Sequence, residues 1–163
     1  MALSNFERLI QLADEAFDYR EDPDQIGMNE EQRSKLLAIH PATMQAENNE
    51  NGPVAWLLVV PTTYDLMRQF IEHNISEKQL LEMTPVGVPY DAIYLCSALV
   101  LEEYRRKGIA EKLTLKAIDE ISNSNPISTI FVWPFSDGGD KVAEKVARET
   151  KLPLLTRSGN MPE

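Results

Sequence analysis

The residue types that point most directly to chemistry stand in one short basic loop. Its members are Arg105, Arg106, Lys107, Gly108, Ile109 and Ala110, between an apolar run and a segment with helical spacing. The first backbone N–H groups of a helix have no acceptor within the helix, and the helix dipole is positive at that end. Gly108 lacks a side chain, so a phosphate oxygen can approach those N–H groups closely. We therefore predict a pyrophosphate-binding site, to which the basic side chains add hydrogen-bond donors.

The charge of the chain favours a small anionic ligand over a polymer. The 163 residues include 26 Asp and Glu against 16 Lys and Arg, a net charge of -10. Such a surface repels nucleic-acid phosphates, so nucleic-acid binding is not expected. Basic residues still gather in one stretch, at Arg105, Arg106, Lys107, Lys112 and Lys116. A solvated helix face is the alternative interpretation of that stretch.

The loop does not match other phosphate-binding patterns. The sequence has no G-x-x-x-x-G-K-[ST], and no G-x-G-x-x-G follows a predicted strand. Arg105 to Ala110 instead fits R-x-x-G-x-A, and the stretch from Leu99 to Ala110 resembles the strand, turn and helix start of the GNAT superfamily of N-acetyltransferases. The resemblance covers the chain from about Ala42 to Leu155, with Glu102 where the family commonly has proline.

The resemblance implies a fold and a donor substrate. The fold would be α/β (α+β), with a mixed, mostly antiparallel central sheet flanked by helices and with splayed central strands. Acetyl-CoA would be the donor, and the backbone of Leu99, Val100 and Leu101 would pair with its pantetheine arm like an added strand. The arm would enter where the strands beginning near Ala92 and Ser128 splay apart.

The resemblance also implies residues on a later helix, where this sequence departs from the family. Relatives often carry Asn, then Ala, then Tyr at positions that read Asp140, Ala143 and Ala147 here. Asp140 can still hydrogen-bond the arm, although a carboxylate near phosphates is electrostatically worse than an amide. Ala147 cannot act as an acid, which weakens the expectation of catalysis.

Tyr94 is the first candidate for the general acid. It occupies the position at which the histone-acetylating branch of the family has a glutamate base. A phenol with a pKa of about 10 is a poor base at neutral pH but can donate a proton. A packed strand aromatic is the alternative interpretation. Cys96 is expected to be a small buried residue, because no His or carboxylate spacing suggests a nucleophile–base pair.

Two further sets of residues carry weaker expectations. Glu47 could reach the acceptor side, but an exposed strand glutamate is the simpler interpretation. His40, His73 and Cys96 are too dispersed to predict a metal site. The segment 64–83 could cover the acceptor pocket, or it could be a helix that fills one face of the sheet.

Hydrophobic spacing predicts the elements that position the loop. Ser4 and Glu7 form a capping-box pattern before a first helix, and a second helix begins near Asn29 with Leu36 and Leu37 facing inward. The remaining predictions are a hairpin over 42–47 and 54–60, helices within 64–83, a strand over 92–101, a helix after Gly108, a strand over 128–133, a helix from about Asp140 and a short strand over 152–156.

These features lead to two hypotheses about function. The first is an N-acetyltransferase that transfers acetyl from acetyl-CoA to a primary amine of a small molecule or peptide. The alternative is an inactive CoA-binding sensor or interaction module of the same fold. We expect one domain over 1–163, a cytoplasmic location because the N-terminus resembles no secretory signal, and no membrane span. The oligomeric state, including a homodimer, and the acceptor stay open.

Overall fold

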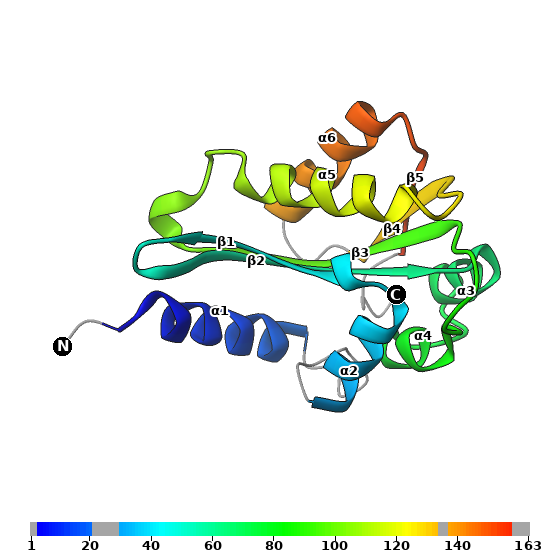
Figure 1. The fold of residues 1–163 in the computed structure, drawn as a ribbon, viewed down its shortest axis with the longest axis horizontal. Coiled ribbons are helices and arrows are strands. Elements are labelled where there is room, and N and C mark those ends of the chain that lie inside the picture. The colour runs from blue at the N-terminus through cyan, green and yellow to red at the C-terminus, as the bar shows by residue number, and fades with distance from the viewer. Residues whose placement is uncertain (1–2, 21–29, 134–136, 158–163) are drawn as a thin grey trace.

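A five-stranded mixed sheet runs through the molecule, with helices on both of its faces (Figure 1). The computed structural model describes residues 3–20, 30–133 and 137–157. The strands lie in sequence order, β1 (Met44–Asn49), β2 (Gly52–Thr62), β3 (Ala92–Val100), β4 (Thr129–Val132) and β5 (Leu154–Thr156). The helices are α1 (Asn5–Arg20), α2 (Glu30–Ile39), α3 (Tyr64–Ile71), α4 (Glu77–Met83), α5 (Ile109–Ser122) and α6 (Asp137–Thr150).

The mixed sheet predicted from the sequence is confirmed. The pairs β1–β2 and β2–β3 are antiparallel, and the pairs β3–β4 and β4–β5 are parallel. The antiparallel ladders are the longer ones, so the sheet is mostly antiparallel by paired length. The parallel pairs arise because α5 and α6 each return the chain to the same end of the sheet. No helix in the described ranges has the length and apolar content to cross a bilayer.

Two helical layers cover the sheet. The upper face, as drawn in Figure 1, is covered by α5 and α6, and the lower face by α1 and α2, with α3 and α4 beyond them. Under α5 and α6 lies one core cluster, which includes Leu57, Ile93 and Ile130. On the lower side, α2, α3 and α4 enclose a second cluster with Tyr94 and Phe131. The segment 64–83 therefore fills a face of the sheet, as the simpler of its two interpretations predicted.

Helix starts follow the predicted caps, whereas one predicted core residue is wrong. Ser4 and Glu7 exchange hydrogen bonds between side chain and backbone, each of 3.1 Å, before α1. On α2, Leu36 is fully buried but Leu37 is 53% exposed. Consecutive helical residues point about 100° apart, and on α2 this step takes Leu37 from the buried side to the solvent side.

The central strands part halfway along β3. β4 pairs with β3 only from Ala92 to Leu95, opposite Thr129 to Val132, whereas β3 continues to Val100. The splayed central strands predicted above are therefore present. On its other edge, β3 contains a β-bulge: Leu95 pairs with Val59 and Ser97 with Leu58, which leaves Cys96 as an extra residue.

Candidate active site

The basic loop forms a concave run of backbone N–H groups. A 3₁₀ turn, Glu102–Tyr104, leads into it, and both Arg106 (φ 64°) and Gly108 (φ 76°) have left-handed backbone conformations. The first hydrogen bond of α5 runs from Lys112 N to Gly108 O, at 2.9 Å. The N–H groups of 106–111 find no acceptor among the described residues. Successive N–H groups in such a conformation form an anion-binding concavity.

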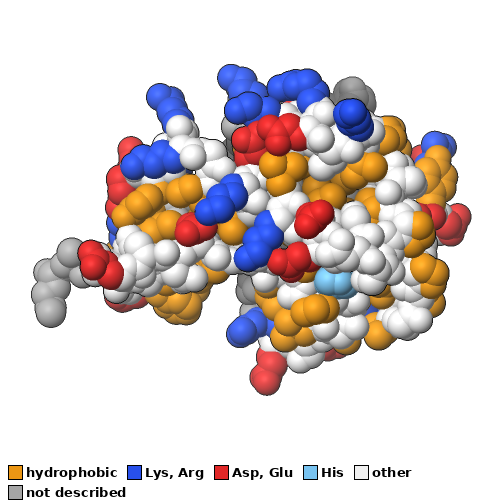
Figure 2. Space-filling view, turned by 45° about the horizontal axis from the view of Figure 1, so that its top comes forward, with side chains coloured by type: hydrophobic (Ala, Val, Ile, Leu, Met, Phe, Trp, Pro, Cys, Tyr) orange, Lys and Arg blue, Asp and Glu red, His pale blue; other side chains and the backbone are white. Residues whose placement is uncertain are grey.

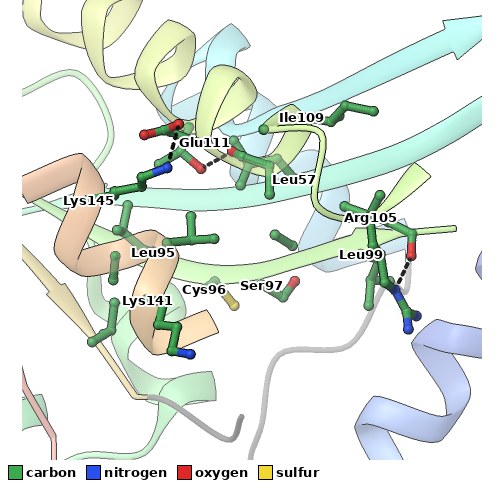
Figure 3. A pocket seen from close by; sticks show the side chains of 18 of the residues that line it. Leu57, Leu95, Cys96, Ser97, Leu99, Arg105, Ile109, Glu111, Lys141 and Lys145 are labelled. Carbon is green, nitrogen blue, oxygen red and sulfur yellow. Dashed lines mark hydrogen bonds and ion pairs between the residues drawn. The ribbon is translucent and has the colours of Figure 1, made fainter. Parts of the chain in front are cut away.

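A cavity of about 970 Å³ begins at this loop and follows the open side of β3 (Figure 3). Its upper part is bounded by Leu57, Leu95 and the first turns of α5 and α6. It continues past the end of the β3–β4 pairing to Trp133 and to the lower face, where Leu12 and Glu15 of α1 line it. Most of the lining is apolar, with charged groups at the loop end, a composition typical of ligand sites.

Basic side chains line the cavity from two elements. Arg105 and Arg106 of the loop line it at one end, and Lys141 and Lys145 line it from α6. Figure 3 shows these two lysines across the cavity from Arg105. Figure 2 shows basic side chains gathered on the side of the molecule that carries α5 and α6. The α6 lysines were missed from the sequence. Their separation of four residues, which places them on one helix face, is the signal that could have found them.

The other predicted basic residues do not line the cavity. Lys112 Nζ lies 3.5 Å from Glu47 Oε1, and the two side chains form an exposed ion pair. The Lys107 ammonium stands 5.4 Å from the centre of the Tyr104 ring. Lys116 is exposed on α5. The solvated-face interpretation therefore fits Lys112 and Lys116, and the anion-site interpretation fits the two arginines.

The open edge of β3 offers fewer backbone groups than predicted. Leu101 N–H donates to Val54 O over 2.9 Å, across the sheet. Because strand residues alternate in direction, Leu99 also faces β2, and Val100 presents its N–H and C=O to the cavity. Arg105 Nε donates to Val100 O over 3.0 Å. Pairing of the arm with this strand stays a prediction, and Val100 is its best-placed residue.

The N-terminal helix is tied to the turn before the loop. Arg8 donates to both carboxylate oxygens of Glu103, over 2.6 and 2.5 Å. This guanidinium lowers the pKa of Glu103 to about 2, chiefly through the hydrogen bonds. Asn49 of β1 donates to the Tyr104 hydroxyl over 2.6 Å. The entry to the loop is thus held from both α1 and the hairpin.

Polar groups meet at the far end of the cavity, in a cluster that was not predicted from the sequence. Cys96 lines the cavity, and its Sγ donates to Glu77 Oε2 on α4 over 3.7 Å. Tyr94 Oη donates to the same oxygen. Glu77 is only 1% exposed. It stands in the first turn of a short helix, where a glutamate is ordinary, so its sequence position does not reveal its burial.

The structure places the remaining predicted residues away from the cavity or outside the described part. Tyr94 is fully buried, with its ring centre 4.9 Å from that of Phe70 and 5.1 Å from that of Phe131. This position favours the packed aromatic over the acid. Ala147 packs against the upper core cluster. Asp140 lies in the first turn of α6, and its side chain is outside the described residues.

Comparison with known proteins gives likenesses of structure only. No protein-family model matches the sequence, and no curated protein matches it. Naa20 from Chaetomium thermophilum, solved with a bisubstrate analogue, is similar over 79% of this chain and 60% of its own, at 14% identity and TM-score 0.49. An aminoglycoside acetyltransferase, meta-AAC0020 from an uncultured soil metagenomic sample, solved with trehalose, is similar over 91% and 84%, at 21% identity and TM-score 0.46.

A further similar structure is AtaTR bound with AcCoA, at 10% identity and TM-score 0.40, over 77% of this chain and 80% of its own. This chain thus spans less than two thirds of the Naa20 chain that it resembles. One of these similar structures is an aminoglycoside acetyltransferase. The cavity and its lining residues carry the functional argument that follows.

Proposed function

We propose that this chain is an N-acetyltransferase, which transfers acetyl from acetyl-CoA to a primary amine of an acceptor. One observation carries the proposal. A run of N–H groups with no acceptor among the described residues stands at one end of a cavity that follows the open edge of β3. A ligand with a pyrophosphate at one end and an extended arm suits that arrangement. A cytoplasmic location belongs to the same proposal.

In this proposal the loop holds the donor and β3 orients it. The pyrophosphate accepts hydrogen bonds from the N–H groups of 106–111, while Arg105 and Arg106 supply charge. From Val100 to Cys96 the strand advances by four residue steps of about 3.3 Å, which span roughly 13 Å along the cavity. The arm would cover this distance and bring the thioester to the gap between β3 and β4.

The acceptor would approach from the lower face, where Leu12 and Glu15 line the cavity. A net charge of -10 and the Glu15 carboxylate favour a cationic amine, because opposite charges raise encounter rates. In the net transfer the C–S bond between the acetyl group and CoA breaks, and a C–N bond forms between the acetyl group and the amine. The sulfur leaves with the electron pair and gains a proton, and the nitrogen loses one. Holding the two reactants together contributes much of the acceleration.

Thiol release tests the proposal. The chain is mixed with acetyl-CoA and spermidine, L-lysine or a peptide with a free N-terminus, and free CoA thiol is followed over time. Amine-dependent release supports the transferase. The burial of Tyr94 and the packing of Ala147 favour the second candidate, a CoA-binding module without transfer. That candidate predicts tight CoA binding with no thiol release on any amine, and this result would exclude the transferase for these acceptors.

A further inference from the structure

A buried carboxyl group stands behind the far end of the cavity. Glu77 stands in the first turn of α4 and is 1% exposed, and its Oε2 accepts hydrogen bonds from Tyr94 and Cys96. Burial of an ionisable carboxyl is costly unless hydrogen bonds compensate it. Tyr94 and Cys96 supply such hydrogen bonds to Glu77.

The hydrogen bonds at Glu77 define the orientation of the Cys96 thiol. Cys96 Sγ donates to Glu77 Oε2 over 3.7 Å, so its hydrogen lies toward α4. Cys96 also lines the cavity. Tyr94 donates to the same carboxylate oxygen and fixes its position. A nucleophile, an adjacent base and a third group that orients the base are the parts of an activated nucleophile.

The β-bulge brings this thiol to the point where the strands part. Leu95 is the last residue of β3 that pairs with β4, and Cys96 is the extra residue next to it. Cys96 and Ser97 project to the same side of β3, the lower one (Figure 3). Bulges re-aim side chains and are common beside active sites. The thiol thus stands at the opening through which the acceptor would meet the donor.

Resting on the proposed acetyl transfer, we propose that Cys96 and Glu77 form a nucleophile–base pair and that the acetyl group passes through Cys96. Glu77 Oε2 takes the thiol proton while Sγ attacks the carbonyl carbon of acetyl-CoA. The C–S bond to CoA then breaks, and its sulfur leaves with the electron pair and takes the proton from Glu77. The amine attacks the new thioester, a C–N bond forms, and Sγ leaves with the electron pair and receives a proton from the nitrogen.

The unaltered chain gives the first test. It is mixed with acetyl-CoA without amine, quenched in acid and examined by peptide mass spectrometry. We expect one acetyl group on Cys96, formed together with one CoA thiol, at a rate no slower than turnover with amine. Addition of the amine should remove that acetyl group. Turnover with amine but no acetyl on Cys96, or acetylation slower than turnover, would overturn the inference and leave the proposed function standing.

Variants locate the base. Glu77→Gln keeps the size of the side chain, and we expect Cys96 acetylation to slow by on the order of 10²-fold or more, with unchanged affinity for CoA. Glu82→Gln, which removes an exposed carboxylate from the same helix, is the matched control and should acetylate at the original rate. Equal rates in both variants would contradict the role of Glu77.

Two further outcomes separate this inference from the function beneath it. Cys96→Ala should abolish both the acetylated intermediate and amine-dependent turnover, and turnover that survives would show direct transfer. If the unaltered chain binds no acetyl-CoA, both the inference and the proposed function fail. Circular dichroism checks that each variant is folded, and the labelling of the unaltered chain decides the matter where a variant is not.

Discussion

The two ends of the cavity are built in different ways. The loop end is local: residues 105–110 follow β3 directly and lead into α5, and their backbone supplies most of the site. The far end is assembled from distant segments, because Cys96 on β3 meets Glu77 from α4 and Trp133 after β4. A motif can therefore reveal the first end, whereas only the tertiary structure reveals the second.

The difference also concerns what each end requires. The loop end depends on a left-handed backbone conformation, which Gly108 permits at φ 76°. The far end needs side chains held at fixed positions by the lower core, so damage to that core should spread to Glu77 and Cys96. The changes below test this contrast between local and assembled construction.

Phe70→Ala should have the largest effect. Phe70 is fully buried, and its ring centre lies 4.9 Å from that of Tyr94 and 6.1 Å from that of Trp133. Loss of a buried aromatic ring typically costs about 3–5 kcal/mol of unfolding free energy. Urea unfolding measures this loss. In the fraction that stays folded, turnover should fall more than CoA affinity does, and an equal fall in both would contradict the contrast between the two ends.

Gly108→Glu should remove CoA binding while the fold persists. A side chain at φ 76° is strained, and the new carboxylate stands where phosphate is proposed to bind. We expect at least about 100-fold weaker binding, or roughly 2.7 kcal/mol, in calorimetric titration. Gly87→Glu is the matched control: Gly87 has φ 82° and open space around it, far from the loop in sequence. Equal affinity in both variants would refute the position of the phosphate site.

Replacement of both Lys141 and Lys145 by Met should weaken CoA binding by a smaller factor. These side chains line the cavity from α6, and Lys145 Nζ lies 3.9 Å from Glu111 Oε2. We expect roughly a 5-fold loss, because the two exposed charges together are worth about 1 kcal/mol. The double replacement of Lys112 and Lys116, which lie outside the cavity, is the control. The loss should shrink as salt rises, and a salt-independent loss would argue against an electrostatic role.

The pair of Arg8 and Glu103 should give the smallest effect, and it depends on pH. The folded chain lowers the pKa of Glu103 from its ordinary 4.5 to about 2. The contribution of this carboxylate is therefore complete above about 4.5 and is lost as pH falls toward about 2. Because the pair is exposed, the change is small.

Hydrogen exchange in α1 measures this effect. Protection of α1 should decrease between pH 5 and pH 3, as the order of the two pKa values requires, and the decrease should be weaker in Glu103→Gln. Arg68→Gln, which breaks the exposed pair with Glu72 on α3, serves as the control. Identical pH profiles for the unaltered chain and Glu103→Gln would contradict the assignment.

The sequence predicted the elements better than the site. Hydrophobic spacing and caps located the hairpin, β3, α5 and the capping box at Ser4 and Glu7, because these depend on neighbours in sequence. The prediction that Leu37 faces inward was wrong, because hydrophobic spacing alone does not show where the buried side of α2 ends. The loop was predicted because its site is mainly backbone.

The far end could not be predicted from neighbouring residues. Glu77 and Cys96 are nineteen positions apart, and their contact depends on how α4 packs against β3. The bulge depends on the pairing of two strands and leaves no mark in either one alone. Lys141 and Lys145 became relevant only when α6 was placed beside the cavity.

The bulge at Cys96 means that the sheet could form without this residue. Leu95 and Ser97 already face opposite sides of the sheet, opposite Val59 and Leu58, as neighbours in a regular strand would. Deletion of Cys96 would close the ladder without moving any other side chain of β3 to the wrong face. The chain thus carries one residue that its architecture could lose, in the manner of proteins that give up regularity for activity. A chain that lacks Cys96 would keep its core and lose the proposed activity.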